Sequence, residues 1–288
     1  MDANNKHIEV DLKKFVVFIL SHGRPHLKDT YKTLRICGYT GKIVVICDNE
    51  DDTIEEYFKE YGKENVYIFD KQKWVEKTDS MNNNGKRNAV VFARNACWDI
   101  AKELGYEYFQ MLDDDYYYFG HKGLEHAKRT LCYNLIVKWF LDFLINQRDN
   151  VKTIAFCQGG DLIGGVDNKP VIKRKAMNSF FCMTNRPIVF KGLINEDVNA
   201  YIEDGIRGGL YITYMRFKLD QGVTQQNDAG LTDIYLDAGT YIKSYYTSMI
   251  SPVGVNIWLM GLNDRRLHHK VNYKKTMPCI ISEDYKKK

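Results

Sequence analysis

The sequence predicts an α/β fold with a mostly parallel central sheet, helices on both faces of that sheet, and a mixed second half. Two observations support this prediction. Over the first 120 residues, short β-branched runs alternate with stretches that have helical spacing. The runs are apolar at almost every position, which is typical of strands buried on both faces. Such alternation indicates a parallel sheet, because a helix usually makes the crossover between parallel strands.

Each element of the first half follows from its own residues. Apolar and β-branched runs predict strands at 15–20, 42–47, 65–70 and 106–112. Helices are expected between them, at 27–37, 53–61 and 85–104. The last helix keeps apolar side chains on one face at helical spacing, namely Ala89, Phe92, Ala93, Ala96 and Ile100.

The pattern changes after residue 120, where strands and helices no longer alternate regularly. A long helix is expected at 124–147, further helices at 196–206 and 233–249, strands at 152–157, 178–184 and 210–219, and two strands at the end. The stretch 159–175 is rich in glycine, which predicts a mobile loop over the carboxylate site that is described below. Because no repeat or low-complexity linker interrupts the chain, 1–288 is expected to be one domain, with halves at about 15–120 and 121–288.

Composition limits the classes of protein to which this chain can belong. The chain has 288 residues, of which 44% are hydrophobic, enough for a substantial core. Its start is polar and carries both acids and bases, unlike a signal peptide, and its longest apolar runs are too short to cross a bilayer. Seven cysteines without a Cys-x-x-Cys pair argue against a disulfide framework and a structural zinc site. We therefore expect a reduced, cytoplasmic protein.

Charge is unevenly distributed, although the net charge is a mild +4. Basic residues concentrate near the end of the chain: Arg265, Arg266, His268, His269, Lys270, Lys274, Lys275, Lys286, Lys287 and Lys288. Such a segment attracts polyanions, and nucleic acid is the first candidate partner. For the last three lysines, a solubilising tail is an equally good interpretation.

Three consecutive carboxylates, Asp113, Asp114 and Asp115, directly follow the apolar run 108–112. A strand that ends in this way places them at the edge of the sheet where open α/β folds bind ligands. Mg²⁺ or Mn²⁺ needs only one or two carboxylates and takes its other ligands from water and phosphate. Aromatic residues follow at 116–119, and in such partly dry surroundings like charges raise one another's pKa unless a cation is present. A solvated acidic turn is the alternative.

Other strand ends also carry polar groups. The first strand runs into Ser21, His22, Gly23, Arg24 and Pro25, where glycine and proline favour a turn and the arginine can pair with phosphate. The second strand is followed by Asp48, and an early acid suits a ribose or a base edge. Either motif alone is more typical of a plain loop. Their shared position at the carboxyl ends of neighbouring strands favours a common site.

The segment Gly85, Lys86, Arg87 and Asn88 is expected to open a helix that continues through Arg94. A helix start with a basic residue can bind phosphate. Arg87 and Arg94 are seven residues apart and would share one helix face, either at the phosphates or in solvent. The sequence has neither a P-loop nor a Gly-x-Gly-x-x-Gly motif, so those two nucleotide folds are not indicated.

Two further acids and two histidines come later in the chain. Asn195 is expected to cap a helix whose first turn contains Glu196 and Asp197, and a carboxylate there could instead act as a general base. His268 and His269 lie in a predicted strand and should point to opposite faces. One of them could then be a metal ligand.

Taken in order, these motifs resemble those of GT-A nucleotide-sugar glycosyltransferases. More closely, the chain resembles the phage TET-associated glycosyltransferases, which modify 5-hydroxymethylcytosine in DNA. The resemblance spans about 15–285. It rests on Ser21-His22-Gly23-Arg24-Pro25, Gly38-Tyr39-Thr40-Gly41-Lys42, Arg87-Asn88-Ala89, Ala93-Arg94-Asn95, Leu112-Asp113-Asp114-Asp115-Tyr116 and His268-His269-Lys270.

The resemblance implies a UDP-sugar donor, Mn²⁺ or Mg²⁺, a DNA acceptor and a role for each motif. Residues 15–120 would form the nucleotide-sugar half and 121–288 the acceptor half. Asp48 would contact uridine, Arg87 and Arg94 the diphosphate region, and Asp197, next to Glu196, would be the base of an inverting reaction. Asp113 and Asp115 would bind the ribose and the metal, and His268 or His269 would complete the set of metal ligands. Asp114 would point away. The full nucleotide-sugar set is Ser21, His22, Gly23, Arg24, Asp48, Arg87, Asn88, Arg94, Asp113 and Asp114.

Three other functions are compatible with the residues alone. A glycosyltransferase of the same kind could act on a glycan, a lipid or a protein. A nucleic-acid-binding module could carry the aspartates for structural reasons. A nucleotidyltransferase would also use paired aspartates and a metal, but it would consume a nucleoside triphosphate and release pyrophosphate.

Overall fold

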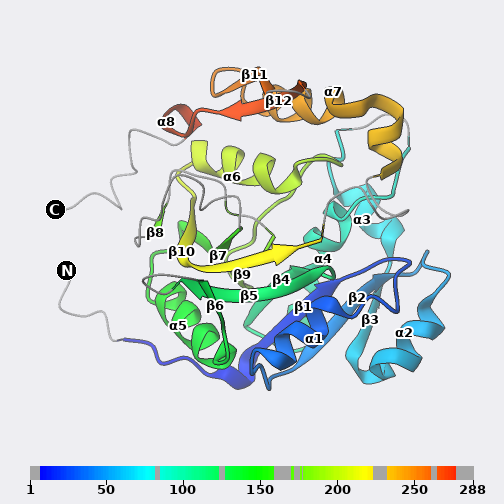
Figure 1. Ribbon diagram of the computed structural model, residues 1–288, viewed down its shortest axis with the longest axis vertical. Helices are drawn as coiled ribbons and strands as arrows, with labels where there is room; N and C mark the ends of the chain where they lie inside the picture. Colours follow the sequence, from blue (N-terminus) through cyan, green and yellow to red (C-terminus); the bar gives the residue numbers. More distant parts are fainter. Residues whose placement is uncertain are drawn as a thin grey trace.

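The computed structural model describes residues 7–81, 85–122, 127–158, 170–171, 176, 178–222, 232–260 and 265–276. Within them, ten strands form one mixed sheet in the order β3-β2-β1-β4-β9-β7-β10-β5-β6, with β8 beside β10 (Figure 1). The first four positions are parallel: β1 (Phe15–Leu20) lies between β2 (Ile43–Asp48) and β4 (Tyr108–Asp113), and β3 (Val66–Phe69) pairs with β2. The predicted parallel sheet of the first half is therefore confirmed.

Helices cover both faces of this sheet, as predicted. Alternate residues of β1 enter two separate cores, Val16 and Phe18 in one and Val17 and Ile19 in the other. The first core is closed by α4 (Val91–Glu103) and α6 (Glu196–Ile206). The second is closed by α1 (Asp29–Ile36) and α5 (Tyr133–Ile145). β2 is also covered by α2 (Ile54–Tyr61), whose Tyr57 is fully buried against it.

The sheet becomes mixed beyond β4. Its remaining strands are β5 (Tyr116–Lys122), β6 (Ala127–Arg129), β7 (Val151–Gln158), β8 (Pro170–Val171), β9 (Phe181–Met183) and β10 (Leu210–Gln221). β10 runs parallel to β7 but antiparallel to β5 and β8. Two single turns of 3₁₀ helix, η1 (Leu12–Lys14) and η2 (Lys63–Asn65), precede β1 and β3.

Several predicted boundaries are wrong. The long helix predicted from residue 124 begins only at Tyr133, because β6 (Ala127–Arg129) occupies part of the predicted range and pairs with β5, in which Tyr116 and Phe119 are buried and Tyr117 is exposed. The helix predicted from Gly85 begins at Val91, and Gly85 itself has a positive φ of 70° that a helix does not allow. α3 (Lys71–Lys77) was not predicted. Of the predicted loop 159–175, all but β8 lies outside the described residues.

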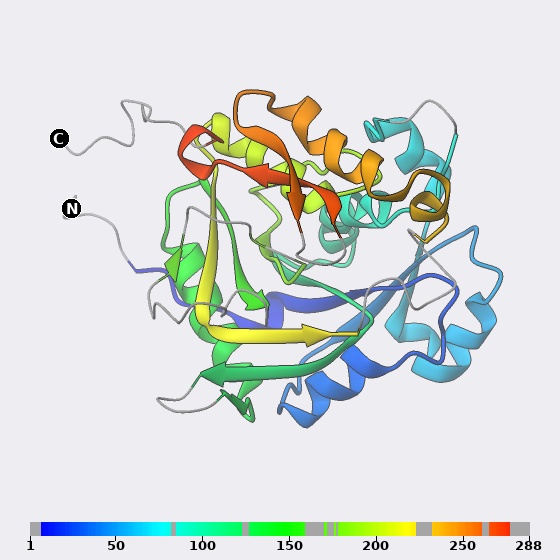
Figure 2. The same cartoon turned by 45° about the horizontal axis from the view of Figure 1, so that its top comes forward.

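A further layer lies over the face that carries α4. It consists of α6, α7 (Thr232–Ile250), the antiparallel pair β11 (Val255–Met260) and β12 (Arg266–Val271), and α8 (Tyr273–Thr276) (Figures 1 and 2). α7 contacts α6 and both strands of the pair. Among the described residues, no helix is both long and apolar enough to cross a membrane.

Candidate active site

The site forms where β1, β2 and β4 end. In the sheet register, Leu20 at the end of β1 is level with Ile46 of β2 and Asp113 of β4. The segments that follow these strands therefore start side by side at the carboxyl edge of the parallel sheet, where α/β folds bind ligands. This confirms the predicted convergence of the strand ends.

The first two aspartates after β4 point to different partners. Asp113 accepts a hydrogen bond from Arg94 Nη2 at 2.9 Å and one from the Tyr116 hydroxyl at 3.2 Å. Asp114 is 2% exposed, accepts a hydrogen bond from Ser21 Oγ at 2.6 Å and pairs with Arg24 Nη2 at 2.7 Å. Asp114 therefore fixes the loop after β1 and is turned away from the partners of Asp113.

Asp115 is different, because no described side chain forms an ion pair or hydrogen bond with its carboxylate. Burial, together with the carboxylates of Asp113 and Asp114, raises the pKa of Asp115 to about 7. Burial also raises the pKa of Asp114 to about 6, although Arg24 and Ser21 oppose the shift. A half-buried carboxylate without a described cation partner is the kind of oxygen donor that binds a divalent metal. By donor type, Asp113 and Asp115 fit Mg²⁺ or Mn²⁺.

Arg94 connects this cluster to α6. Its side chain is 1% exposed, and its Nε lies 3.0 Å from Glu196 Oε1 while its Nη2 holds Asp113. Burial opposes the charge on the guanidinium, but the carboxylates of Asp113 and Glu196 outweigh it and raise the pKa of Arg94. Burial and Asp197 raise the pKa of Glu196, and Arg94 counteracts them. The second ion pair, from α4 to α6, was not predicted from the sequence.

The start of α6 holds the two candidate catalytic acids. Glu196 is engaged by Arg94, whereas Asp197, 7% exposed, has no hydrogen-bond partner among the described side chains. Asn195 occupies the predicted N-cap position of this helix, but its side chain makes no capping hydrogen bond. It adopts a left-handed backbone conformation, with φ of 57°, and its Nδ2 donates to the Lys243 carbonyl at 2.7 Å and to Thr247 Oγ1 at 3.1 Å. Asn195 thus attaches the start of α6 to α7.

The two histidines of β12 leave the strand on opposite faces, as predicted, because His268 lies opposite Trp258 and His269 opposite Ile257, but their rings still lie together. Their rings stack with centroids 4.5 Å apart, and His268 Nδ1 donates to the carbonyl of His269 at 2.6 Å, which draws the first ring alongside the second. His269 Nδ1 lies 3.3 Å from Asn195 Nδ2, so His269 borders the candidate catalytic acids. In the described part of the chain, no three His, Cys, Asp or Glu side chains are grouped as a metal site.

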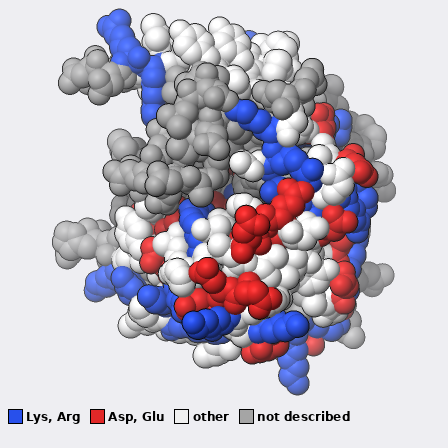
Figure 3. All heavy atoms as spheres, turned by 90° about the vertical axis from the view of Figure 1, so that its right-hand side faces the viewer, with Lys and Arg blue, Asp and Glu red and all other residues white. Residues whose placement is uncertain are grey.

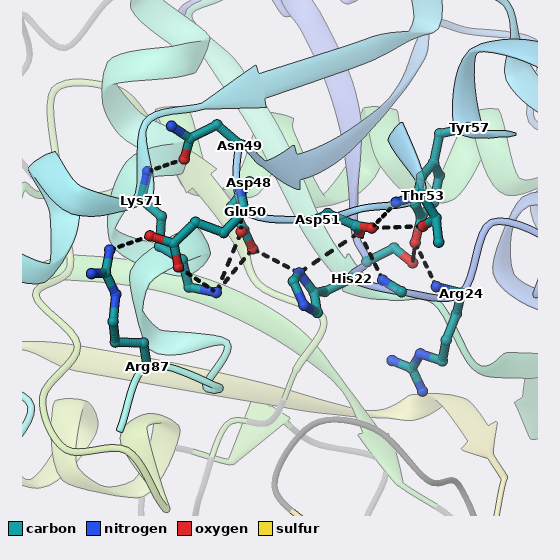
Figure 4. Close-up of polar contacts among 12 residues, drawn as sticks. His22, Arg24, Asp48, Asn49, Glu50, Asp51, Thr53, Tyr57, Lys71 and Arg87 are labelled. Atoms are coloured by element: carbon teal, nitrogen blue, oxygen red, sulfur yellow. Dashed lines mark hydrogen bonds and ion pairs between the residues drawn. The ribbon is translucent and has the colours of Figure 1, made fainter. Parts of the chain in front are cut away.

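A second cluster surrounds Asp48 (Figure 4). Asp48 is 6% exposed, lies 2.9 Å from His22 Nδ1 and accepts from Lys71 Nζ at 3.3 Å. Burial by itself would raise the pKa of Asp48, but the His22 hydrogen bond and the Lys71 ammonium lower it; the same hydrogen bond raises the pKa of His22. Lys71 was missed because α3 was not predicted. Its position directly after the predicted strand 65–70 was the signal that could have found it.

The remaining predicted residues hold the loops around this cluster. Gly23 N donates to Asp51 Oδ2 at 2.7 Å, and Arg24 N donates to the Tyr57 hydroxyl at 2.9 Å. Arg87 pairs with Glu50, and it lies in the loop before α4, so the prediction that it shares a helix face with Arg94 is wrong. Asn88 is exposed in the same loop.

An α/β sheet with carboxylates and arginines at the carboxyl ends of its parallel strands offers that edge to a polar, charged ligand. The comparisons with known proteins identify the class further. A family model described as TET-Associated Glycosyltransferase matches residues 15–230, which is 216 of the 288 residues. The chain belongs to this family and is a glycosyltransferase. No curated protein sequence matches it.

Solved structures with a similar chain path are distant in sequence. GalNAc-T7 with UDP, GalNAc and Mn²⁺ has a TM-score of 0.48 and 12% identity, over 83% of this chain and 48% of that one. Glucosyl-3-phosphoglycerate synthase from Mycobacterium tuberculosis has a TM-score of 0.45 and 10% identity, over 89% and 87%. The mannosyltransferase PcManGT from Pyrobaculum calidifontis has a TM-score of 0.43 and 9% identity, over 74% and 58%.

Proposed function

We propose that the protein moves a sugar from a UDP-sugar to the hydroxymethyl group of 5-hydroxymethylcytosine in DNA, with Mn²⁺ or Mg²⁺. One observation carries the proposal. Within a glycosyltransferase family, this chain holds two carboxylates, Asp115 and Asp197, that form no hydrogen bond or ion pair with a described side chain, while Arg94 engages a neighbour of each. One suits a metal on the donor side and the other a base on the acceptor side.

The donor would lie along the carboxyl edge of the parallel strands. Asp48 would bind the uridine, and Asp113 the ribose. The Ser21 to Arg24 loop, with Arg87 and Asn88, would surround the diphosphate. We assign Arg94 a structural role instead of a phosphate contact, because its guanidinium is 1% exposed and already engages Asp113 and Glu196.

Asp113 and Asp115 would hold the metal, and His269 is favoured over His268 as a further ligand because it borders the start of α6. When bound, the divalent metal supplies positive charge that stabilises the departing diphosphate. Asp197 would take the proton of the acceptor hydroxyl while that oxygen bonds to the anomeric carbon and the bond to UDP breaks, with oxocarbenium character in the transition state. Inversion of the anomeric centre follows if this is one direct displacement.

A DNA acceptor is supported by the basic segment that includes Arg265, Arg266 and Lys270. We also propose that 1–288 is a single domain, with a nucleotide-sugar half at about 15–120 and an acceptor half after it. The proposed location is the cytoplasm, which is that of the host if a phage encodes the chain. A glycan, lipid or protein acceptor is the second candidate.

The test is to incubate the protein with Mn²⁺, mixed UDP-sugars and DNA that contains 5-hydroxymethylcytosine, and to weigh the digested nucleosides by mass spectrometry. A hexose or pentose increment on the modified cytosine is expected, and added salt should weaken the reaction by weakening DNA binding. UDP binding that needs Mn²⁺, without any increment, would move the acceptor to another class. Absence of UDP binding would refute the proposed donor, and pyrophosphate release would indicate a nucleotidyltransferase.

A further inference from the structure

One face of the pair β11 and β12 packs on the core at its Val255 end, although Leu259 of the same face is 55% exposed, and the other face is turned outward. Opposite residues in its antiparallel register share a face, so Val255 lies with Val271, Asn256 with Lys270, and Met260 with Arg266. Val255 is 2% exposed and belongs to the core under α6, with Val271 packed against it. Asn256, Trp258, Met260, Arg266 and Lys270 are all exposed. The second set therefore forms an outward face, which we name the hairpin face.

Trp258 is the largest side chain on the hairpin face. It is 55% exposed, and Lys270 Nζ lies 4.4 Å from the centre of its ring. An exposed indole beneath an ammonium offers a flat apolar surface and a positive charge in the same place. Proteins that bind nucleic acid combine these two features, stacking bases or sugars on an aromatic ring and pairing phosphates with nearby cations.

Basic residues predominate around the hairpin face, although Asp264 directly precedes Arg265 in the sequence. The described residues between 241 and 276 contain no Asp or Glu, but they contain Lys243, Arg265, Arg266, Lys270, Lys274 and Lys275. None of the described carboxylates pairs with Arg266 or Lys270, so their charge is available to a ligand. By contrast, the side of the molecule in Figure 3 carries Lys and Arg next to clusters of Asp and Glu, which a polyanion would not favour.

The hairpin is also connected to the candidate catalytic acids. His269, on the strand that carries Arg266 and Lys270, lies 3.3 Å from Asn195, and Glu196 and Asp197 follow Asn195 directly. By the register, His269 lies with Ile257 on the other face of the pair, so the same short strand carries the proposed ligand contacts on one face and the contact with the start of α6 on the other. Figure 2 shows the pair at the front of the upper layer, above the sheet.

From these observations we infer that the hairpin face is the docking surface for duplex DNA, with Trp258 as a stacking or sugar-packing contact and Arg266 and Lys270 as phosphate contacts. The inference rests on the proposed DNA acceptor and adds where the DNA binds. A neutral glycan could also stack on Trp258, but it would leave the two cations without a role, so DNA is favoured.

The experiment compares two exposed tryptophans by fluorescence anisotropy with a short labelled duplex. Trp258→Ala should weaken binding at least about fivefold, the lower limit for removal of a stacked aromatic ring. Trp139→Ala, in α5 on the other face of the sheet, is the matched control, because Trp139 is also 55% exposed and also follows an exposed lysine, Lys138. The control should bind DNA like the original protein.

A second pair of variants tests the charges. Arg266→Gln with Lys270→Gln should weaken binding and reduce the slope of log affinity against log salt by about two, one for each phosphate that the variant no longer neutralises. Lys138→Gln should leave this slope unchanged. Because these substitutions lie on the exposed surface, they also test the inference if Trp258→Ala does not fold.

Binding of UDP in the presence of Mn²⁺ separates a failure of the proposed DNA-docking surface from a failure of the proposed UDP-sugar donor. Retained UDP binding with weakened DNA binding in the hairpin variants supports the docking surface. Equal DNA binding by the hairpin and α5 variants refutes it, as does absence of DNA binding by the original protein. Transfer to a neutral glycan that depends on Trp258, with unchanged DNA binding, also refutes it. Absence of UDP binding by the original protein refutes the proposed donor without bearing on where DNA binds.

Discussion

Two carboxylate clusters at the same sheet edge are neutralised to different extents. Around Asp48, the protein supplies its own cations, with His22 and Lys71 directly on the carboxylate. After β4, Asp113 shares Arg94 with Glu196, Asp114 takes Arg24, and Asp115 has no cation among the described residues. The first cluster is therefore prepared for a neutral group such as a nucleobase, and the second for a ligand that brings positive charge.

The largest expected effect is a loss of sugar transfer when Asp115, in the cluster after β4, is replaced. Asp115→Ala should reduce sugar transfer by about 10³-fold or more, since charge stabilisation on the leaving group would be removed. Thermal stability should be unchanged or higher, because the variant removes a carboxylate whose burial is unfavourable. Steady-state transfer and thermal unfolding measure the two effects. Asp52→Asn, an exposed aspartate nearby, is the control, and normal turnover by Asp115→Ala would refute the metal role.

The second-largest expected effect is a loss of folding stability when Arg94 is replaced. Arg94→Met should lower the free energy of unfolding by about 3–5 kcal/mol, because the buried carboxylate of Glu196 and the partly buried carboxylate of Asp113 would lose their shared cation. Urea denaturation measures it. Arg207→Met is the control, since Arg207 is exposed and its pair with Glu203 should contribute less than about 1 kcal/mol. Equal losses in the two variants would mean that the Arg94 pairs do not stabilise the fold.

Metal binding should distinguish the two clusters directly. Mn²⁺ at a hundred times its dissociation constant should stabilise the original protein by about 2.7 kcal/mol, because only the folded state assembles the carboxylates. The effect should disappear in Asp115→Asn and persist in His22→Gln, whose substitution lies in the Asp48 cluster. Thermal unfolding with Mn²⁺ and with a chelator gives the comparison. Loss of the effect in His22→Gln alone would place the metal at Asp48.

The smallest effect is a pH dependence of the Asp48 cluster. The pKa of His22 is raised by Asp48, so its contribution is complete below the unfolded value of 6.5 and is lost as pH rises through the folded pKa. The lowered pKa of Asp48 makes its contribution complete above 3.8 and lost as pH falls through the folded pKa. The pair should therefore stabilise most between pH 3.8 and 6.5, by no more than about 1 kcal/mol because His22 is partly exposed.

Denaturation of His22→Gln and the original protein at several pH values tests this expectation. The difference in unfolding free energy between the two proteins should shrink from pH 5 to pH 9, because nearly all of the His22 imidazole is neutral at about pH 9. A difference that grows over this interval would contradict it.

The sequence predicted the carboxyl edge of the parallel strands well because strand ends are local signals. β1 has the predicted bounds, and the carboxyl ends of β1, β2 and β4 converge as expected. Contacts set by tertiary packing were not predictable in this way. The Arg94 to Glu196 pair joins residues 102 positions apart, and the Asn195 contacts with α7 replace the local cap that its sequence favours. Lys71 was missed because a seven-residue helix has too little periodicity to recognise.

The ion pairs of Arg94 limit how α6 can move relative to α4. If α6 tilted far enough to separate Glu196 from Arg94, a buried charge would lose its partner, which costs about 3–5 kcal/mol. By the Boltzmann relation, such a state would be populated in less than about 1% of molecules. Any opening that admits a bulky acceptor should therefore leave α4 and α6 together, and their relative orientation should be the same with and without substrates.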